Sequence, residues 1–202
     1  MLLKICGFRT ETEIESVKSL HIDYLGLNFI DGARPQLNLT EALLLKPLLD
    51  GMDARLVGLF KDQPIDTVIN IATQIKLDYV QLNGHEDQAY TQAIKIPIMR
   101  TIAVSQSTSS DEIFSYIDSH PAEIYILDRF NQGTGARVNP VLAQIVINKY
   151  PDKILLAGGL SATSIPDLLT QVKPYGLDIS GGVRTNGYID SRKVHEILSL
   201  IK

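Results

Sequence analysis

The sequence predicts an α/β protein, a (β/α)8 barrel in which eight parallel strands close on themselves with the helices outside. Short apolar runs alternate with helical segments eight times along the 202 residues, a pattern typical of a parallel sheet covered by helices. The length lies near the lower limit of roughly 200 residues for this barrel, so the loops must be short. An open doubly wound sheet is the alternative, although it more often has about five or six strands. The whole chain, residues 1–202, is expected to form one domain.

Each expected strand is a short apolar run that ends at a glycine or a polar residue. Strands buried on both faces read as such runs. The eight runs are residues 2–6, 24–29, 55–60, 79–82, 98–102, 124–128, 153–157 and 177–180.

Most expected helices begin at a recognisable signal. At Thr10, Asn38 and Ser109, a polar residue is followed three positions later by glutamate, which is the pattern of a capping box. Proline, whose fixed φ suits a first helical turn, opens the helices near residues 64 and 140. The remaining helices are expected from about residues 86, 161 and 190.

Composition narrows the class of protein. The net charge of −4 gives no basic surface for nucleic acid, and no apolar run approaches the ~20 residues of a membrane span. The start of the chain does not read as a signal peptide, because Lys4 interrupts it. A single cysteine excludes an internal disulfide and fits a reducing compartment, so a cytoplasmic protein is expected. The four histidines have no metal-ligand spacing, and no metal is expected.

Two glycine pairs follow the last two expected strands. Gly158 and Gly159 end the seventh, and Gly181 and Gly182, preceded by Ser180, end the eighth. In (β/α)8 barrels these loops form the usual phosphate site, where backbone N–H groups face the anion. The alternative is that each pair is only a tight turn between strand and helix. Two pairs at this place favour a phosphate site.

Cys6 and Asp128 end the first and sixth expected strands, on opposite sides of a closed barrel. A thiolate can act as a base, and a carboxyl group in a confined pocket can act as an acid. Such a pair suits proton transfer at two ends of one sugar-sized substrate. The alternatives are that Cys6 is a small buried apolar residue and that Asp128 caps the loop after its strand.

Further polar residues are expected at or below the same rim. Arg34, after the second strand, is either a fork for a carboxylate or a solvated loop residue. Gln81 and Asn83 share one face of the fourth strand and can point into the pocket. Lys4 and Arg100 are expected inside the barrel, where buried charges need partners. Asp178 is one candidate partner. These residues are Lys4, Arg34, Gln81, Asn83, Arg100 and Asp178.

Six motifs in order along the chain resemble the phosphoribosylanthranilate isomerase family of tryptophan biosynthesis. They are residues 4–7 (Lys-Ile-Cys-Gly), 57–60 (Val-Gly-Leu-Phe), 80–86 (Val-Gln-Leu-Asn-Gly-His-Glu), 127–128 with 133–135 (Leu-Asp and Gly-Thr-Gly), 156–160 (Leu-Ala-Gly-Gly-Leu) and 176–183 (Gly-Leu-Asp-Ile-Ser-Gly-Gly-Val). The resemblance spans the chain and implies a (β/α)8 barrel that performs an Amadori rearrangement.

The resemblance also implies roles for residues. Asp128 would be the general acid that opens the ribose ring, and Cys6 the general base that removes the proton from C2. The ligand would be a small phosphorylated molecule, and neither a metal nor an organic cofactor would be needed. The protein would be a monomer or a homodimer. The residues implied to contact the substrate besides the phosphate loops are Arg34, Gln81, Asn83 and Asp178.

Several positions depart from the family pattern. Residues 33–35 read Ala-Arg-Pro where a Ser-Pro-Arg-like triplet is usual, so the arginine is shifted by one. Asn83 replaces a histidine, Gln132 and Gly181 replace a glycine and a serine, and Arg184 replaces a glutamate. This pattern is typical of a divergent member, or of a relative acting on another N-substituted ribosyl phosphate. A barrel that binds sugar phosphate without turnover is a further alternative, but it would not require Cys6 and Asp128.

Overall fold

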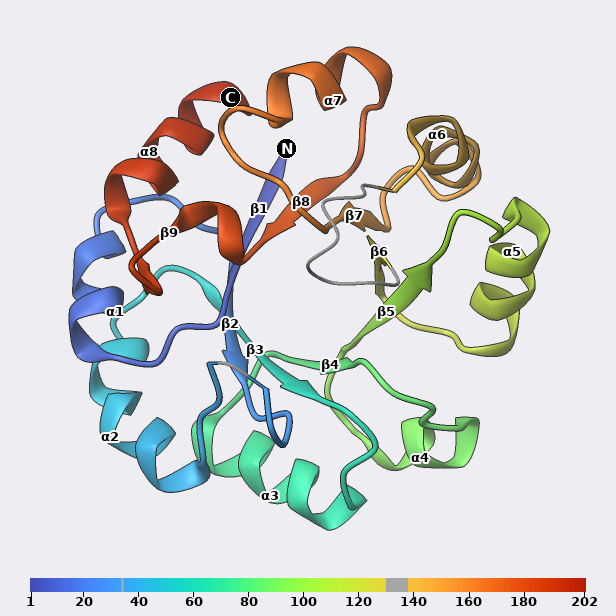
Figure 1. Ribbon diagram of the computed structural model, residues 1–202. Coiled ribbons are helices and arrows are strands. Elements are labelled where there is room, and N and C mark those ends of the chain that lie inside the picture. The colour runs from blue at the N-terminus through green and yellow to red at the C-terminus, as the bar shows by residue number, and fades with distance from the viewer. Residues whose placement is uncertain (34, 130–137) are drawn as a thin grey trace.

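The computed structural model describes residues 1–33, 35–129 and 138–202. Its eight parallel strands form a closed barrel in the order β1-β2-β3-β4-β5-β6-β7-β8, ringed by helices (Figure 1). This confirms the predicted (β/α)8 barrel. The strands are β1 (Leu2–Cys6), β2 (Tyr24–Asn28), β3 (Arg55–Phe60), β4 (Tyr79–Leu82), β5 (Ile98–Val104), β6 (Ile124–Arg129), β7 (Ile154–Leu156) and β8 (Gly176–Ile179). The helices are α1 (Glu11–Val17), α2 (Leu39–Leu49), α3 (Ile65–Ile75), α4 (Gln88–Ala93), α5 (Ser110–Ser119), α6 (Pro140–Lys149), α7 (Ile165–Gln171) and α8 (Ser191–Leu200).

The first and last strands close the barrel. β1 pairs with β2 and with β8, and Lys4 lies in register with Tyr24 on one side and Asp178 on the other. Alternate residues of the strands point inward and form a separate buried cluster, while the others pack under the helices. The members of the inner cluster are Cys6, Tyr24, Val57, Leu59, Tyr79, Met99, Ile124, Ile126, Leu155 and Ala157.

The three predicted capping boxes are present. The side chains of Thr10, Asn38 and Ser109 accept from the backbone of the glutamate three residues on, and each glutamate side chain accepts from the cap. Helix α7 begins at Ile165, four residues after the predicted start. The hydroxyl and carbonyl groups of residues 161–164 instead form a turn, in which Ser161 N donates to Ser164 Oγ at 2.9 Å.

A short hairpin after β8 was not predicted. A one-turn 3-10 helix, η1 (Gly181–Val183), leads into β9 (Arg184–Thr185), which pairs antiparallel with β10 (Tyr188–Ile189). Asn186 and Gly187 form its turn with φ of 52° and 81°. An Asn-Gly pair is the strongest short-range signal for this kind of turn, so the sequence contained the information.

The prediction for Arg100 is wrong. Its Nη2 donates to Glu86 O at 2.7 Å and to Thr91 Oγ1 at 2.6 Å, and its Nη1 donates to Tyr116 OH at 3.3 Å. These partners lie around α4 and α5, outside the barrel. On β5, Met99 belongs to the inner cluster, so the side chain of the next residue, Arg100, must face outward.

Within the described residues, no helix combines the length and the apolar character needed to cross a membrane. The same residues contain no group of three or more His, Cys, Asp or Glu side chains arranged to hold a metal ion.

Candidate active site

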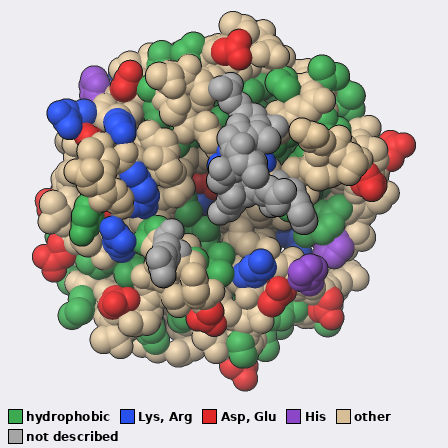
Figure 2. Space-filling model, in the orientation of Figure 1, with side chains coloured by type: hydrophobic (Ala, Val, Ile, Leu, Met, Phe, Trp, Pro, Cys, Tyr) green, Lys and Arg blue, Asp and Glu red, His purple; other side chains and the backbone are tan. Residues whose placement is uncertain are grey.

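The candidate site lies at the carboxyl ends of the barrel strands. Figure 1 looks along the barrel axis, with the strands at the centre and the helices around them. In the same orientation, Lys and Arg side chains gather on the part of this face over α1, α8 and β9 (Figure 2).

Lys4 and Asp178 form an ion pair inside the barrel, as the sequence predicted. Lys4 Nζ donates to both carboxylate oxygens of Asp178, at 2.9 and 3.0 Å. The Lys4 side chain is fully buried, and that of Asp178 is 10% exposed. The pair brings two charges from neighbouring strands directly beneath the end of β1, where Cys6 lies two residues beyond Lys4 on the same face.

Removal of the Lys4 charge should destabilise the fold strongly. In Lys4→Met, Asp178 stays buried but loses the ammonium that pairs with its carboxylate in the described structure. Breaking a buried ion pair by removing one partner costs about 3–5 kcal/mol of folding stability. Urea unfolding followed by circular dichroism measures the change. The matched control is Lys18→Met, which removes the exposed Lys18–Glu15 pair and should cost at most about 1 kcal/mol. Equal losses in the two variants would contradict a structural role for the Lys4–Asp178 pair.

Cys6 is buried, with 9% of its surface exposed. Gly26 on β2 leaves room for the thiol, since a Cβ there would lie 3.1 Å from Cys6 Sγ. Burial raises the pKa of Cys6 to about 11, and Asp178 acts in the same direction, whereas the ammonium of Lys4 and the guanidinium of Arg184 oppose the rise. In the ligand-free protein, Cys6 is therefore a neutral thiol at physiological pH.

Asp128 lies beside the first glycine pair. By alternation along β6 it faces inward, since Ile126 belongs to the inner cluster. Its Oδ1 accepts from Arg129 N at 2.8 Å. A Cβ on Gly158 would lie 2.7 Å from the same oxygen, and Gly158 has a φ of +84°. The turn after β7 therefore requires glycine both for its backbone conformation and for the space that Asp128 occupies.

The loops that carry the two glycine pairs lie against each other. A Cβ on Gly182 would overlap the carbonyl oxygen of Leu160, so the loop after β8 packs directly on the loop after β7. Within the described residues, a Cβ placed on Gly181 would have no neighbouring atom within 4 Å. η1 begins directly after Ser180. The structure therefore places the two loops of the predicted phosphate site side by side, with Gly158 and Gly159 in one and Ser180, Gly181 and Gly182 in the other.

Gln81 and Asn83 form a polar network with Thr101, which sequence reasoning missed as a site residue. Gln81 Nε2 donates to Asn83 Oδ1 and to Thr101 Oγ1, both at 3.0 Å, and Thr101 Oγ1 donates to Asn83 Oδ1 at 2.6 Å. Asn83 Nδ2 donates to Phe60 O at 3.2 Å. Thr101 stands one residue beyond Arg100, so the inward placement expected for Arg100 would have turned Thr101 outward. Within the described structure, the buried Oε1 of Gln81 has no hydrogen-bond partner.

Arg34 and the predicted Gly-Thr-Gly loop at 133–135 lie outside the described residues. The chain next to Arg34 is described, and it returns to the end of β1. A Cβ on Gly7 would lie 3.1 Å from Pro35 Cγ and 2.7 Å from Arg184 Nη2. The loop after β2 and the segment after β8 therefore meet beside Gly7.

Comparisons with known proteins agree with this architecture. Residues 3–199 match the family described as N-(5'phosphoribosyl)anthranilate (PRA) isomerase. The chain is 30% identical to the N-(5'-phosphoribosyl)anthranilate isomerase of Oceanobacillus iheyensis, over 100% of this chain and 97% of that protein. It is also 30% identical to the enzyme of that name from Acetivibrio thermocellus, over 99% and 95% of the two chains.

Solved structures show the same fold. The phosphoribosyl anthranilate isomerase of Thermococcus kodakaraensis superimposes with a TM-score of 0.86 at 21% identity, over 100% of this chain and 98% of that one. A structure of such an isomerase in complex with reduced 1-(o-carboxyphenylamino)-1-deoxyribulose 5-phosphate gives a TM-score of 0.80 at 20% identity, with the same coverage. From the family match over nearly its full length, this chain belongs to the N-(5'-phosphoribosyl)anthranilate isomerase family.

Proposed function

We propose that this protein converts N-(5'-phosphoribosyl)anthranilate to 1-(o-carboxyphenylamino)-1-deoxyribulose 5-phosphate by an Amadori rearrangement, with Cys6 and Asp128 as its catalytic residues. The observation that carries the assignment of roles is the position of these two side chains. Cys6 ends β1 and Asp128 lies near the end of β6, both on the inner side of the strands. β7 and β8 separate them on the shorter way round the barrel, so the two side chains reach the mouth of the barrel from different sides.

In the proposed mechanism, Asp128 protonates the ring oxygen of the ribose. The bond from C1 to the ring oxygen breaks, and the nitrogen lone pair forms a protonated Schiff base at C1. Cys6 then removes the proton from C2, and the electron pair of that bond flows to the nitrogen to give an enolamine. Tautomerisation yields the ketone at C2, so C2 is oxidised, C1 is reduced and no outside oxidant is needed. Each proton transfer contributes on the order of 10²–10⁴-fold to the rate.

The raised pKa of Cys6 is compatible with this role. A base must give up its own proton before it accepts one, and burial makes the free thiolate rare. Three cationic groups favour the thiolate during the reaction, which are the ammonium of Lys4, the guanidinium of Arg184 and the protonated Schiff base of the substrate itself. The thiol would therefore release its proton to solvent when the substrate ring has opened, and the thiolate then takes the proton from C2, which couples the second proton transfer to the first.

The remaining site residues are proposed to hold the substrate. The glycine loops after β7 and β8 would bind the phosphate through backbone N–H groups. The unpartnered Gln81 Oε1 suits a sugar hydroxyl, because a buried acceptor without a donor costs about 1–3 kcal/mol. Asn83 belongs to the same network. Asp178 accepts from Lys4, yet a carboxylate has about four lone-pair sites and so can accept from a substrate donor as well.

An assay with phosphoribosylanthranilate, made in situ from anthranilate and phosphoribosyl pyrophosphate by the corresponding transferase, tests the function. Turnover to the aminoketose phosphate is expected. Folded protein that binds the substrate without turnover would favour a sugar-phosphate-binding barrel. If the protein does not turn over phosphoribosylanthranilate but does turn over another N-substituted ribosyl phosphate, it is a related isomerase with a different substrate. We also propose that the protein is cytoplasmic. We propose that it is a monomer or a homodimer, and the mass measured by light scattering would distinguish these two states.

Arg34 is proposed to bind the anthranilate carboxylate. Arg34→Ala should raise KM by about 10-fold or more, since a charge-assisted hydrogen bond contributes about 1.5–3 kcal/mol, and should leave kcat within about 3-fold. Steady-state kinetics measure both. The control is Arg192→Ala, which removes an arginine whose side chain is 87% exposed on α8. A KM for Arg34→Ala equal to that of the control would make Arg34 a solvated loop residue.

A further inference from the structure

The guanidinium of Arg184 lies against the carboxyl end of β1 and donates four hydrogen bonds. Its Nη2 donates to Gly7 O at 2.6 Å and to Cys6 O at 3.2 Å. Its Nη1 donates to Gly187 O at 2.8 Å and to Glu13 Oε1 at 3.2 Å. The side chain is 12% exposed. An arginine 178 residues along the chain from Cys6 therefore holds the backbone of the proposed base.

The backbone at Cys6 needs support on this side. The register between β1 and β8 ends at Ile5 and Ile179, whereas the register with β2 continues to Cys6 and Gly26. On the β2 side, Gly26 O accepts from Gly7 N at 2.9 Å and from Phe8 N at 3.2 Å. On the β8 side, Arg184 donates to the two carbonyls at the point where the sheet pairing stops. The chain turns there, with a φ of +90° at Gly7.

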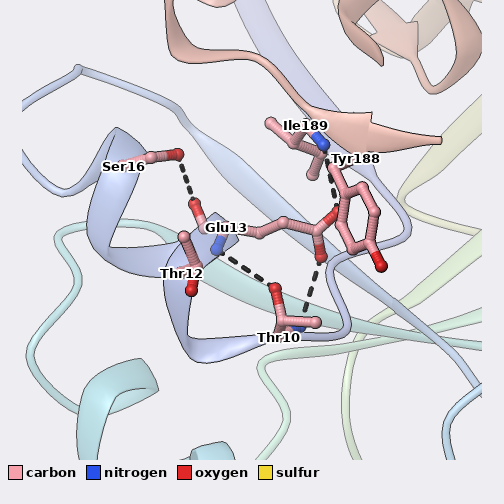
Figure 3. Close-up of a pocket in the computed structure, with 6 residues that line it drawn as sticks. All are labelled: Thr10, Thr12, Glu13, Ser16, Tyr188 and Ile189. Carbon is pink, nitrogen blue, oxygen red and sulfur yellow. Dashed lines mark hydrogen bonds between the residues drawn. The ribbon is translucent and has the colours of Figure 1, made fainter. Parts of the chain in front are cut away.

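Glu13 in turn fixes Arg184. Its carboxylate is nearly inaccessible, at 2% exposure. One oxygen accepts from Arg184 and from Ile189 N at 3.0 Å, and the other accepts from Arg9 N at 2.9 Å and Thr10 N at 3.2 Å. Figure 3 shows Glu13 between Thr10 and the β10 residue Ile189. Both Nη atoms of Arg184 are thus used within the protein, so the guanidinium is not presented as a fork for a substrate carboxylate.

We propose that Arg184 is a positioning residue for Cys6, which holds the carbonyl groups of Cys6 and Gly7 and thereby fixes where Sγ meets the substrate. The proposal rests on the proposed role of Cys6 as the general base. The positive charge has a second effect, because it lowers the pKa of Cys6. The other charged groups acting on the thiol are Lys4, which lowers that pKa, and Asp178, which raises it.

The first test separates kcat from KM. Arg184→Gln should lower kcat by about 10- to 100-fold, because a displacement of the base by about 1 Å can cost 10²-fold, with KM within about 3-fold of the wild-type value. Arg184→Lys keeps the charge but has one nitrogen in place of two, so it cannot bond the two carbonyls of β1 and the Nη1 partners Gly187 O and Glu13 Oε1 together. Its kcat should therefore fall in between. The control is Arg192→Gln, which removes an exposed arginine bonded to Asp190 and should change neither constant.

The second test needs no turnover. Cys6 is the only cysteine, so the rate of alkylation by iodoacetamide against pH, followed by mass spectrometry, reports this thiol alone. Arg184→Gln should shift the midpoint to higher pH, while Arg192→Gln should keep the wild-type midpoint. If the wild-type protein does not turn over phosphoribosylanthranilate, the proposed function fails and this measurement still decides the role of Arg184 toward Cys6.

Three outcomes would overturn the proposal. One is Arg184→Gln with kcat within 2-fold of wild type and an unchanged alkylation profile. Another is a loss that appears in KM alone, which would place Arg184 in substrate binding. If Arg184→Gln does not fold, Arg184→Lys decides, and a wild-type kcat in that folded variant would show that the guanidinium is not needed to position Cys6.

Discussion

Cys6→Ala should lower kcat by roughly 10²–10⁴-fold with the fold intact, since this is the usual contribution of a general base. The substitution removes one buried sulfur and leaves the Lys4–Asp178 pair and the backbone bonds around Gly7 in place. KM should change little, because the thiol is proposed to act on C2 in the transition state and not to hold the phosphate or the carboxylate.

The control and the pH dependence sharpen this test. Cys6→Ser keeps the size and a donor but replaces the thiol with a far weaker acid, so its kcat should resemble that of Cys6→Ala. In the wild-type protein, kcat/KM reports groups of the free enzyme, so a limb at high pH should follow the thiol, whose pKa burial raises to about 11. This limb should be missing in both variants. A kcat within about 3-fold of wild type in Cys6→Ala would assign the base to another residue.

The pairing of Lys4 with Asp178 could be predicted because two simple rules meet there. Alternation places Lys4 and Cys6 on one face of β1, and closure of the barrel makes β8 the neighbour of β1. Arg100 shows the limit of the first rule. Alternation separates two faces of a strand but does not say which one is inside, and the outward side of β5 offered Arg100 a carbonyl and two hydroxyl groups as partners.

Arg184 was noticed in the sequence only as a departure from the family pattern. Its contacts depend on three features that a sequence does not display. The sheet pairing on one side of Cys6 stops early, the β9–β10 hairpin brings Gly187 O next to the guanidinium, and the buried carboxylate of Glu13 comes from α1. Thr101 was missed for the same reason as Arg100, since an inward Arg100 turns the next side chain of β5 outward.

Asp128→Asn should lower kcat by roughly 10²–10⁴-fold, because an amide cannot supply the proton that opens the ribose ring. The asparagine oxygen can still accept from Arg129 N, so the loop contact that the carboxylate makes there is retained. The side chain keeps its size beside Gly158, and no new clash with the turn after β7 is expected. Steady-state kinetics with phosphoribosylanthranilate measure the loss, and circular dichroism checks the fold.

The reaction step at which each variant stops distinguishes the role of Asp128 from that of Cys6. With Asp128→Asn the substrate ring should stay closed, whereas with Cys6→Ala the ring can open and the C2 proton should remain. Hydrogen exchange from solvent into C2, followed by mass spectrometry of the recovered substrate, should therefore be absent in both variants, while trapping of the opened Schiff base with borohydride should succeed only in Cys6→Ala. The matched control is Asp152→Asn, an exposed aspartate in the turn before β7, which should leave kcat unchanged. Trapping in Asp128→Asn at the level of Cys6→Ala would mean that another group opens the ring and that Asp128 is not the general acid.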